Sequence, residues 1–187
     1  MRRTDICIAV CTRNRPEPLS EALQSLAGLT TSDEFRYSVL VVNNGSIEAT
    51  SKIILDAKSN YPQLNLRSVN EPRVGFAHAR NRATQETDAP WIAFFDDDQI
   101  ADPNWLIELW QTTQRNKTVC VGGAVHLKFI APTFQPGPYC RQMLGETQPC
   151  DRTSVRFGIQ SRHRKPTDQT KCDSGGRRIR NRPYWQR

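Results

Sequence analysis

The sequence lacks any apolar run long enough to cross a membrane, and it lacks the pattern of a secretory signal. Arg2-Arg3 precedes only six apolar residues, Ile6 to Cys11, whereas a membrane helix needs about 18 or more. Six cysteines are present, but no two form a CxxC pair. We therefore expect a cytoplasmic protein, at most peripheral at the inner face of the membrane, with reduced cysteines and no metal site built from Cys and His.

Most of the chain also lacks a net positive charge. The formal net charge is +7, but residues 150–187 hold 11 Lys or Arg and 3 Asp or Glu, while residues 1–149 hold 15 and 16. Only eight of the last 38 residues are hydrophobic, against 61 of the first 149. A segment so poor in apolar side chains cannot build a core. We expect one folded domain over residues 4–145 and a basic, disordered tail over 146–187.

Apolar runs alternate with helix-like segments along the first part of the chain. The runs 6–11, 37–42 and 91–95 are typical of buried strands, and a more exposed strand is expected at 64–69 and a further one at 119–125. Between them, apolar residues recur at three-to-four spacing, as in Leu19, Ala22, Leu23 and Leu26. This alternation predicts an α/β fold with a mostly parallel sheet flanked by helices.

Three consecutive aspartates, Asp96 to Asp98, follow the apolar run 91–95 directly. A buried strand delivers the residues behind it to the carboxyl edge of the sheet, where open α/β folds bind ligands. Asp96 and Asp98 would face the same side of an extended chain, and carboxylate oxygens suit Mg²⁺ or Mn²⁺. The alternative is a solvated acidic turn with a helix cap. For Asp102 we expect a structural role, as the cap of the helix that begins at about Pro103.

Four motifs together resemble family 2 glycosyltransferases, whose nucleotide-diphospho-sugar-binding fold is called GT-A. They are ICIAVCTRNRPEPLSEALQSL, VLVVNNGS, NEPRVGFAHARNRA and WIAFFDDDQIADPNWL, in the order of the family, and the match fades after VGGAVHLKF. The resemblance covers about residues 4–130. It implies a GT-A donor-binding domain that takes a nucleotide-diphospho-sugar as its donor.

The resemblance also implies roles for single residues. Thr12 and Arg15 match positions that hold the nucleotide, and Asn43 stands where the family usually has an aspartate that reads the base. An amide still offers a donor and an acceptor. Arg80 matches a position near the base and ribose, whereas Arg73 and Arg82 could face either the diphosphate or solvent. His78 has no visible partner, and we expect a structural role for it.

The aspartates match the DxD motif of the family. The resemblance implies that Asp96 contacts the ribose or the metal and that Asp98 binds a Mn²⁺ or Mg²⁺ ion that bridges the diphosphate. Such an ion would neutralise the charge that grows on the leaving group. Asp97 would brace the turn.

The catalytic base and the acceptor-binding segment of the family are not recognisable in the sequence. Inverting members use a carboxylate well downstream of the DxD to deprotonate the acceptor, and here Glu146 and Asp173 lack the family context. The sequence therefore leaves two functions open. One is metal-assisted, inverting transfer of a sugar to a saccharide, lipid-linked or small-molecule acceptor. The other is a catalytically inactive remnant of a truncated or frameshifted gene that at most binds nucleotide-sugar.

Three other functions fit the sequence less well. Nucleotidyltransferases with this kind of sheet carry a Gly-rich, Lys-containing loop after the first strand, where this chain has residues 12–16, TRNRP. Haloacid-dehalogenase phosphatases place their aspartate pair after the first strand, with Thr or Val where this chain has Ile100. The basic tail contains no recognised nucleic-acid-binding module, and we expect no nucleic-acid partner.

Overall fold

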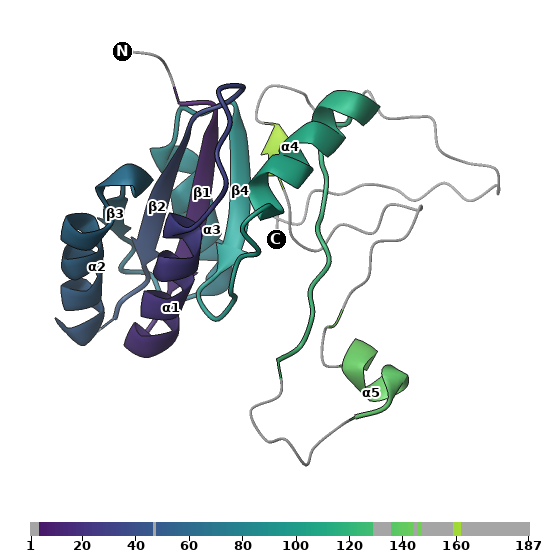
Figure 1. The fold of residues 1–187 in the computed structure, drawn as a ribbon. Coiled ribbons are helices and arrows are strands. Elements are labelled where there is room, and N and C mark those ends of the chain that lie inside the picture. The colour runs from purple at the N-terminus through teal and green to yellow at the C-terminus, as the bar shows by residue number, and fades with distance from the viewer. Residues whose placement is uncertain (1–3, 47, 129–135, 144–145, 147–158, 162–187) are drawn as a thin grey trace.

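The computed structural model describes residues 4–46, 48–128, 136–143, 146 and 159–161. Strands and helices alternate along the chain as predicted (Figure 1). The strands are β1 (Ile6–Thr12), β2 (Tyr37–Asn43), β3 (Arg67–Asn70), β4 (Trp91–Asp96) and β5 (Ile159–Ser161). The helices are α1 (Pro16–Ala27), α2 (Glu48–Asn60), α3 (Phe76–Glu86), α4 (Trp105–Asn116) and α5 (Pro138–Met143), with a short 3-10 turn η1 (Pro62–Leu64).

The sheet has the strand order β3-β2-β1-β4-β5, and the first four strands are mutually parallel. This confirms the predicted parallel sheet. The register pairs Thr12 with Asn43, Asn43 with Asn70 and Cys11 with Asp96. The last residues of four strands are therefore aligned at one edge, which is the carboxyl edge of the sheet.

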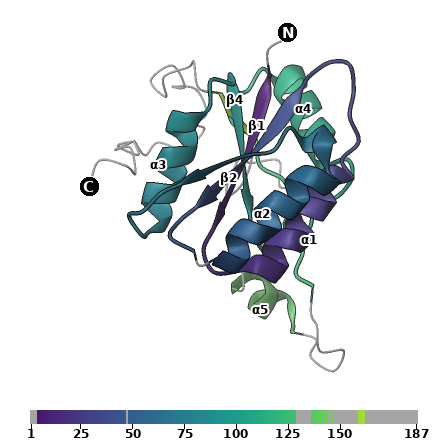
Figure 2. The same ribbon diagram turned by 90° about the vertical axis from the view of Figure 1, so that its left-hand side faces the viewer.

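Helices cover both faces of the sheet (Figures 1 and 2). On one face, alternate residues of β1 and β2 pack with apolar residues of α1, α2 and α4. On the other face, the intervening residues, such as Ala9 and Val42, pack with Ala79 and Ala83 of α3. Both faces of the central strands are thus buried, which explains why their sequences are continuous apolar runs.

Helix α1 has the boundaries that its sequence predicts. Pro16 stands at its start and Gly28 follows its end, the positions where these residues are favoured. The four apolar residues at three-to-four spacing are all fully buried. Their spacing places them on one stripe of the helix, against the sheet.

Two strand predictions need correction. The strand expected at 64–69 begins only at Arg67, because Pro62–Leu64 form a 3-10 turn and Asn65 adopts a left-handed conformation with φ 45°. Residues 119–125 do not form a strand, and only Cys120 and Val125 make isolated bridges. Gly123 instead lies beside the indole ring of Trp105 in α4, so the glycines allow a close approach and not a further strand.

The last strand was not predicted. Ile159–Ser161 pair antiparallel with Trp91, Ile92 and Ala93 of β4. Apart from Glu146 and these three residues, the tail expected at 146–187 lies outside the described residues. No helix in the described part of the chain is long and apolar enough to cross a membrane.

Candidate functional site

The turns behind β1 and β2 are joined by side-chain hydrogen bonds at the carboxyl edge. The Ser46 hydroxyl accepts the backbone N–H of Asn14 at 3.1 Å, and Asn43 Oδ1 accepts the backbone N–H of Ser46 at 2.9 Å. Ser46 therefore links the two turns. Gly45 adopts the positive φ of 72° that the tight turn requires.

Two arginines neutralise much of the charge on the three aspartates. Arg15 Nη1 lies 2.7 Å from Asp98 Oδ2 and 3.4 Å from Asp97 Oδ1, and Arg80 Nη2 lies 3.5 Å from Asp96 Oδ1. Asp97 is buried, Asp96 is half-buried and Asp98 is exposed. The cluster carries a formal charge of −1, so it can still attract a cation.

The surroundings of these groups shift their pKa values. Burial raises the pKa of Asp96, Arg80 opposes that shift, and the neighbouring carboxylates Asp98 and Asp97 add to it. The hydrogen bond to Asp98 raises the pKa of Arg15. The aspartates are therefore close enough to interact electrostatically, which is the situation that a bound cation relieves.

Arg80 lies between two aromatic rings as well as beside Asp96. Its guanidinium carbon is 4.0 Å from the centre of the Phe76 ring and 4.8 Å from that of Phe94. Such cation–π contacts add to the ion pair in fixing the guanidinium. Arg80 thus connects the start of α3 with the end of β4.

A pocket of about 230 Å³ opens at the same edge. It is lined by Cys11, Thr12, Arg13, Asn44, Val74, Gly75, Phe76 and Ala79. The Thr12 hydroxyl is buried and has no hydrogen-bond partner in the described structure, an arrangement that a bound ligand would correct. Burial raises the pKa of the Cys11 thiol to about 12, so that this side chain is uncharged.

Asn44 holds the loop that forms the other wall of the pocket. Its amide group donates to the carbonyl oxygens of Glu71 at 2.9 Å and Arg73 at 2.8 Å, and its Oδ1 accepts the N–H of Gly75 at 2.8 Å. Gly75 has a φ of 143°, which side chains rarely allow. The backbone at the start of α3 is therefore fixed by β2.

The arginines considered for diphosphate contact are already paired. Arg73 Nε lies 2.9 Å from Glu71 Oε1, and Arg82 Nη2 lies 2.6 Å from Glu86 Oε1. His78 is exposed on α3. Asp102 accepts the N–H of Asn104 at 2.8 Å. Helix α4 begins at Trp105 and its N-cap residue is Asn104, so the prediction that Asp102 caps a helix from about Pro103 is wrong, although its contact is with the backbone of the turn.

Most of the predicted site residues meet at this edge, although not all in the expected arrangement. Thr12 lines the pocket, Arg15 and Arg80 contact the aspartates, and Asn43 is buried with its Oδ1 already used. Asp96 and Asp98 contact different arginines. Sequence reasoning did not predict the contact of Asp97 with Arg15. It also predicted no role for Asn44 and Phe76, which only their positions directly after β2 and directly after Gly75 could have indicated.

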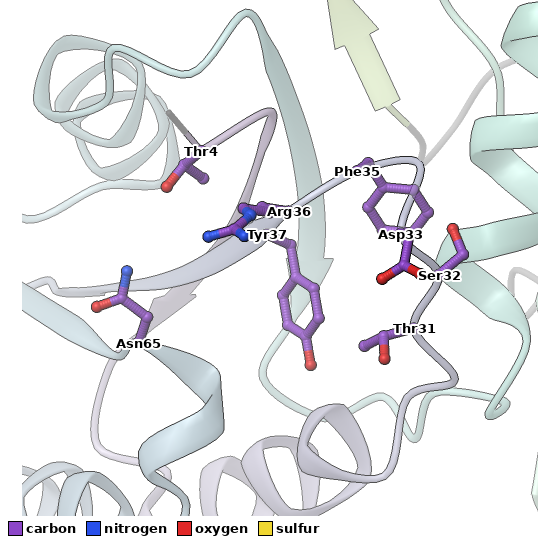
Figure 3. A pocket seen from close by; sticks show the side chains of 8 residues that line it. All are labelled: Thr4, Thr31, Ser32, Asp33, Phe35, Arg36, Tyr37 and Asn65. Atoms are coloured by element: carbon purple, nitrogen blue, oxygen red, sulfur yellow. The ribbon is translucent and has the colours of Figure 1, made fainter. Parts of the chain in front are cut away.

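A larger cavity, of about 400 Å³, lies at the opposite, amino edge of the sheet. Figure 3 shows its lining of Thr4, Thr31, Ser32, Asp33, Phe35, Arg36, Tyr37 and Asn65. These residues precede or begin the strands. Since ligands of parallel α/β sheets bind at the carboxyl ends of the strands, we assign the site to the smaller pocket and the aspartates.

The aspartates are candidate ligands for a metal ion. No group of three or more His, Cys, Asp or Glu in the described residues is arranged to hold a metal ion. Mg²⁺ is commonly held by only one or two carboxylates together with substrate phosphates. Asp96 and Asp98 fit that partial role, since both are accessible and each is paired only with an arginine.

Comparisons with known proteins identify the family and the fold of the chain. The model of the family described as glycosyl transferase family 2 matches residues 7–186. The succinoglycan biosynthesis protein ExoM of Rhizobium meliloti is 29% identical over 124 residues, 66% of this chain and 40% of that protein. The teichoic acid poly(glycerol phosphate) polymerase of Staphylococcus epidermidis is 32% identical over 98 residues, 51% of this chain and 13% of that protein. The chain thus spans less than half the length of these relatives.

Solved structures share the fold. S. aureus TarS 1–349 superimposes with a TM-score of 0.58 at 20% identity, covering 72% of this chain and 39% of that one. The mannosyltransferase PcManGT from Pyrobaculum calidifontis, in complex with GDP-Man and Mn²⁺, gives 0.60 at 21% identity, covering 67% and 36%. These likenesses confirm the predicted GT-A fold. The family model extends over nearly the whole chain, and we conclude that the chain belongs to glycosyl transferase family 2.

Proposed function

We propose that the chain binds a nucleotide-diphospho-sugar at the carboxyl edge of its sheet and transfers the sugar to an acceptor. The observation that carries this proposal is the buried, unpaired Thr12 hydroxyl in a pocket beside the Asp96–Asp98 cluster. The pocket is lined by apolar and uncharged polar groups and by Arg13, which suits a nucleoside. Arg15, together with a cation held by the adjacent aspartates, would suit its diphosphate. Family membership and the solved relative TarS in complex with UDP-GlcNAc support the same ligand class.

Asp96 and Asp98 would hold a Mn²⁺ or Mg²⁺ ion, with the remaining ligands from the diphosphate and water. When bound, this ion supplies positive charge against the leaving nucleoside diphosphate. Arg15 would exchange Asp98 for a phosphate oxygen, because its guanidinium is half-exposed and can rotate. Arg80, fixed by Phe76, Phe94 and Asp96, would stay in place and orient Asp96.

Transfer with inversion requires a carboxylate to deprotonate the acceptor hydroxyl. Among the described residues after Asp98, Asp102 bonds the backbone of Asn104 and Glu146 lies 3.5 Å from Arg141. Neither these nor Glu108 lines the pocket. This observation favours a second candidate function, which is binding of nucleotide-sugar without transfer.

Thermal unfolding with nucleoside diphosphate and Mn²⁺ tests donor binding. We expect UDP or another nucleoside diphosphate with Mn²⁺ to raise the Tm, and Asp98→Ala to remove the Mn²⁺-dependent part of that shift. No shift for the wild-type chain with any nucleotide would refute the donor site. Release of nucleoside diphosphate from a panel of nucleotide-sugars and acceptors would then separate transfer from binding alone.

A further inference from the structure

An aromatic side chain lies exposed at the mouth of the pocket. Phe76, the first residue of α3, is 63% exposed and contributes to the pocket lining. Val74, two residues earlier, is 51% exposed and lines the same pocket. Two exposed apolar side chains that line one pocket beside polar groups are typical of a ligand-binding site.

The Phe76 ring is held in position from one side. The Arg80 guanidinium carbon lies 4.0 Å from its centre, and Arg80 is itself fixed by Phe94 and Asp96. The backbone is fixed as well, because Asn44 Oδ1 accepts the N–H of Gly75. Since one face of the ring meets Arg80 and most of the residue remains exposed, the other face is available as a rigid, flat surface.

The residues around Phe76 indicate which part of a ligand would meet this surface. Arg80 contacts both the Phe76 ring and Asp96, and it therefore lies between the ring and the charged cluster of aspartates. The pocket beside the ring is also lined by the Cys11 side chain, the unpaired Thr12 hydroxyl and the exposed Arg13. A ligand with a flat apolar end and an anionic end, oriented along Arg80, matches both.

We propose that Phe76 stacks against the base of the donor nucleotide and is a binding residue of the donor site. The inference rests on the proposed function and adds a residue to it. Because every base has a flat aromatic face, this contact contributes affinity without selecting one base. Stacking on an aromatic side chain contributes enough that its removal weakens binding by about 5- to 150-fold.

Calorimetric titration of the full chain in Mn²⁺ tests this role. Wild type is titrated with UDP, GDP, CDP, dTDP and ADP, and the nucleotide that binds most tightly is compared with inorganic pyrophosphate in each variant. We expect Phe76→Ala to weaken nucleotide binding by about 5- to 150-fold and to leave pyrophosphate binding within about twofold. Phe76→Trp should keep wild-type affinity for the nucleotide, and Phe76→Leu should not.

The matched control is Leu55→Ala. Leu55 is also 63% exposed, but it lies on α2, and its removal should change neither titration. Unfolding curves show whether each variant is folded. If Phe76→Ala does not fold, the titrations of Phe76→Leu test the proposal in its place.

Four results would overturn the proposal. Nucleotide affinity unchanged in Phe76→Ala and Phe76→Leu would refute stacking while leaving the proposed function intact. Equal losses for nucleotide and pyrophosphate would mean that Phe76 acts only by positioning Arg80. Unchanged nucleotide binding with weakened binding of the corresponding nucleotide-sugar, titrated in the same way, would place the sugar on the ring. If wild type bound none of the five nucleotides, the proposed function itself would fail.

Discussion

The Arg15 guanidinium lies 2.7 Å from the Asp98 carboxylate, and the two side chains are 53% and 54% exposed. An ion pair so open to water contributes little, about 0–1 kcal/mol. Either side chain can therefore leave the other for a stronger partner with little loss of free energy. Arg15 thus occupies the place beside Asp98 that the proposed function gives to a divalent cation.

Arg15→Ala is expected to strengthen Mn²⁺ binding by the chain without nucleotide. The substitution frees Asp98 and makes the formal charge of the cluster −2 in place of −1, so the gain should reach at most about fivefold. Mn²⁺ titrations followed by electron paramagnetic resonance measure it. Arg115→Ala, an exposed arginine of α4, should leave the affinity unchanged. Weaker Mn²⁺ binding in Arg15→Ala would contradict competition at Asp98.

Asn44→Ala is expected to destabilise the domain by about 2–4 kcal/mol. The buried amide makes three hydrogen bonds to the backbone of residues 71–75, and each buried group left without a partner costs about 1–3 kcal/mol. Asn44→Asp has nearly the same shape but cannot donate, so it should be destabilising too. Urea unfolding measures both variants, with exposed Asn81→Ala as the control. A loss below about 1 kcal/mol in both would mean that the loop is held by other contacts.

The parallel sheet and the general position of the site could be predicted from the sequence because each depends on local patterns. Continuous apolar runs identified β1, β2 and β4, and parallel strands necessarily bring Thr12, Asn43 and Asp96 to one edge. Partner choice within the site was not predictable in this way. Whether Arg15 contacts Asp97 or Asp98 depends on how two turns that lie 82 and 83 positions apart meet in the fold. Whether Asn43 keeps a free oxygen depends on the conformation of the tight turn that leads to Ser46.

The pair Glu71–Arg73 is expected to make stability depend on pH in the acid range. Hydrogen bonds from the Arg73 side chain and backbone lower the pKa of Glu71 from 4.5 to about 2. A lowered pKa in the folded state gives stability that is present above 4.5 and is lost as the pH falls toward 2. The difference in Tm between wild type and Glu71→Gln should therefore shrink over that range. Glu34→Gln, at an exposed glutamate, should show no such trend.

Cys11 is expected to resist alkylation although it lines the pocket. Burial raises its pKa from 9.0 to about 12, so at pH 8 its thiolate fraction is roughly a thousandfold below that of an ordinary cysteine. Cys140 is exposed on α5 and should react first with iodoacetamide. Peptide mass spectrometry over time measures both rates, and in urea the two should become similar. Comparable rates in the folded chain would show that Cys11 is neither buried nor neutral, and the description of that pocket wall would have to change.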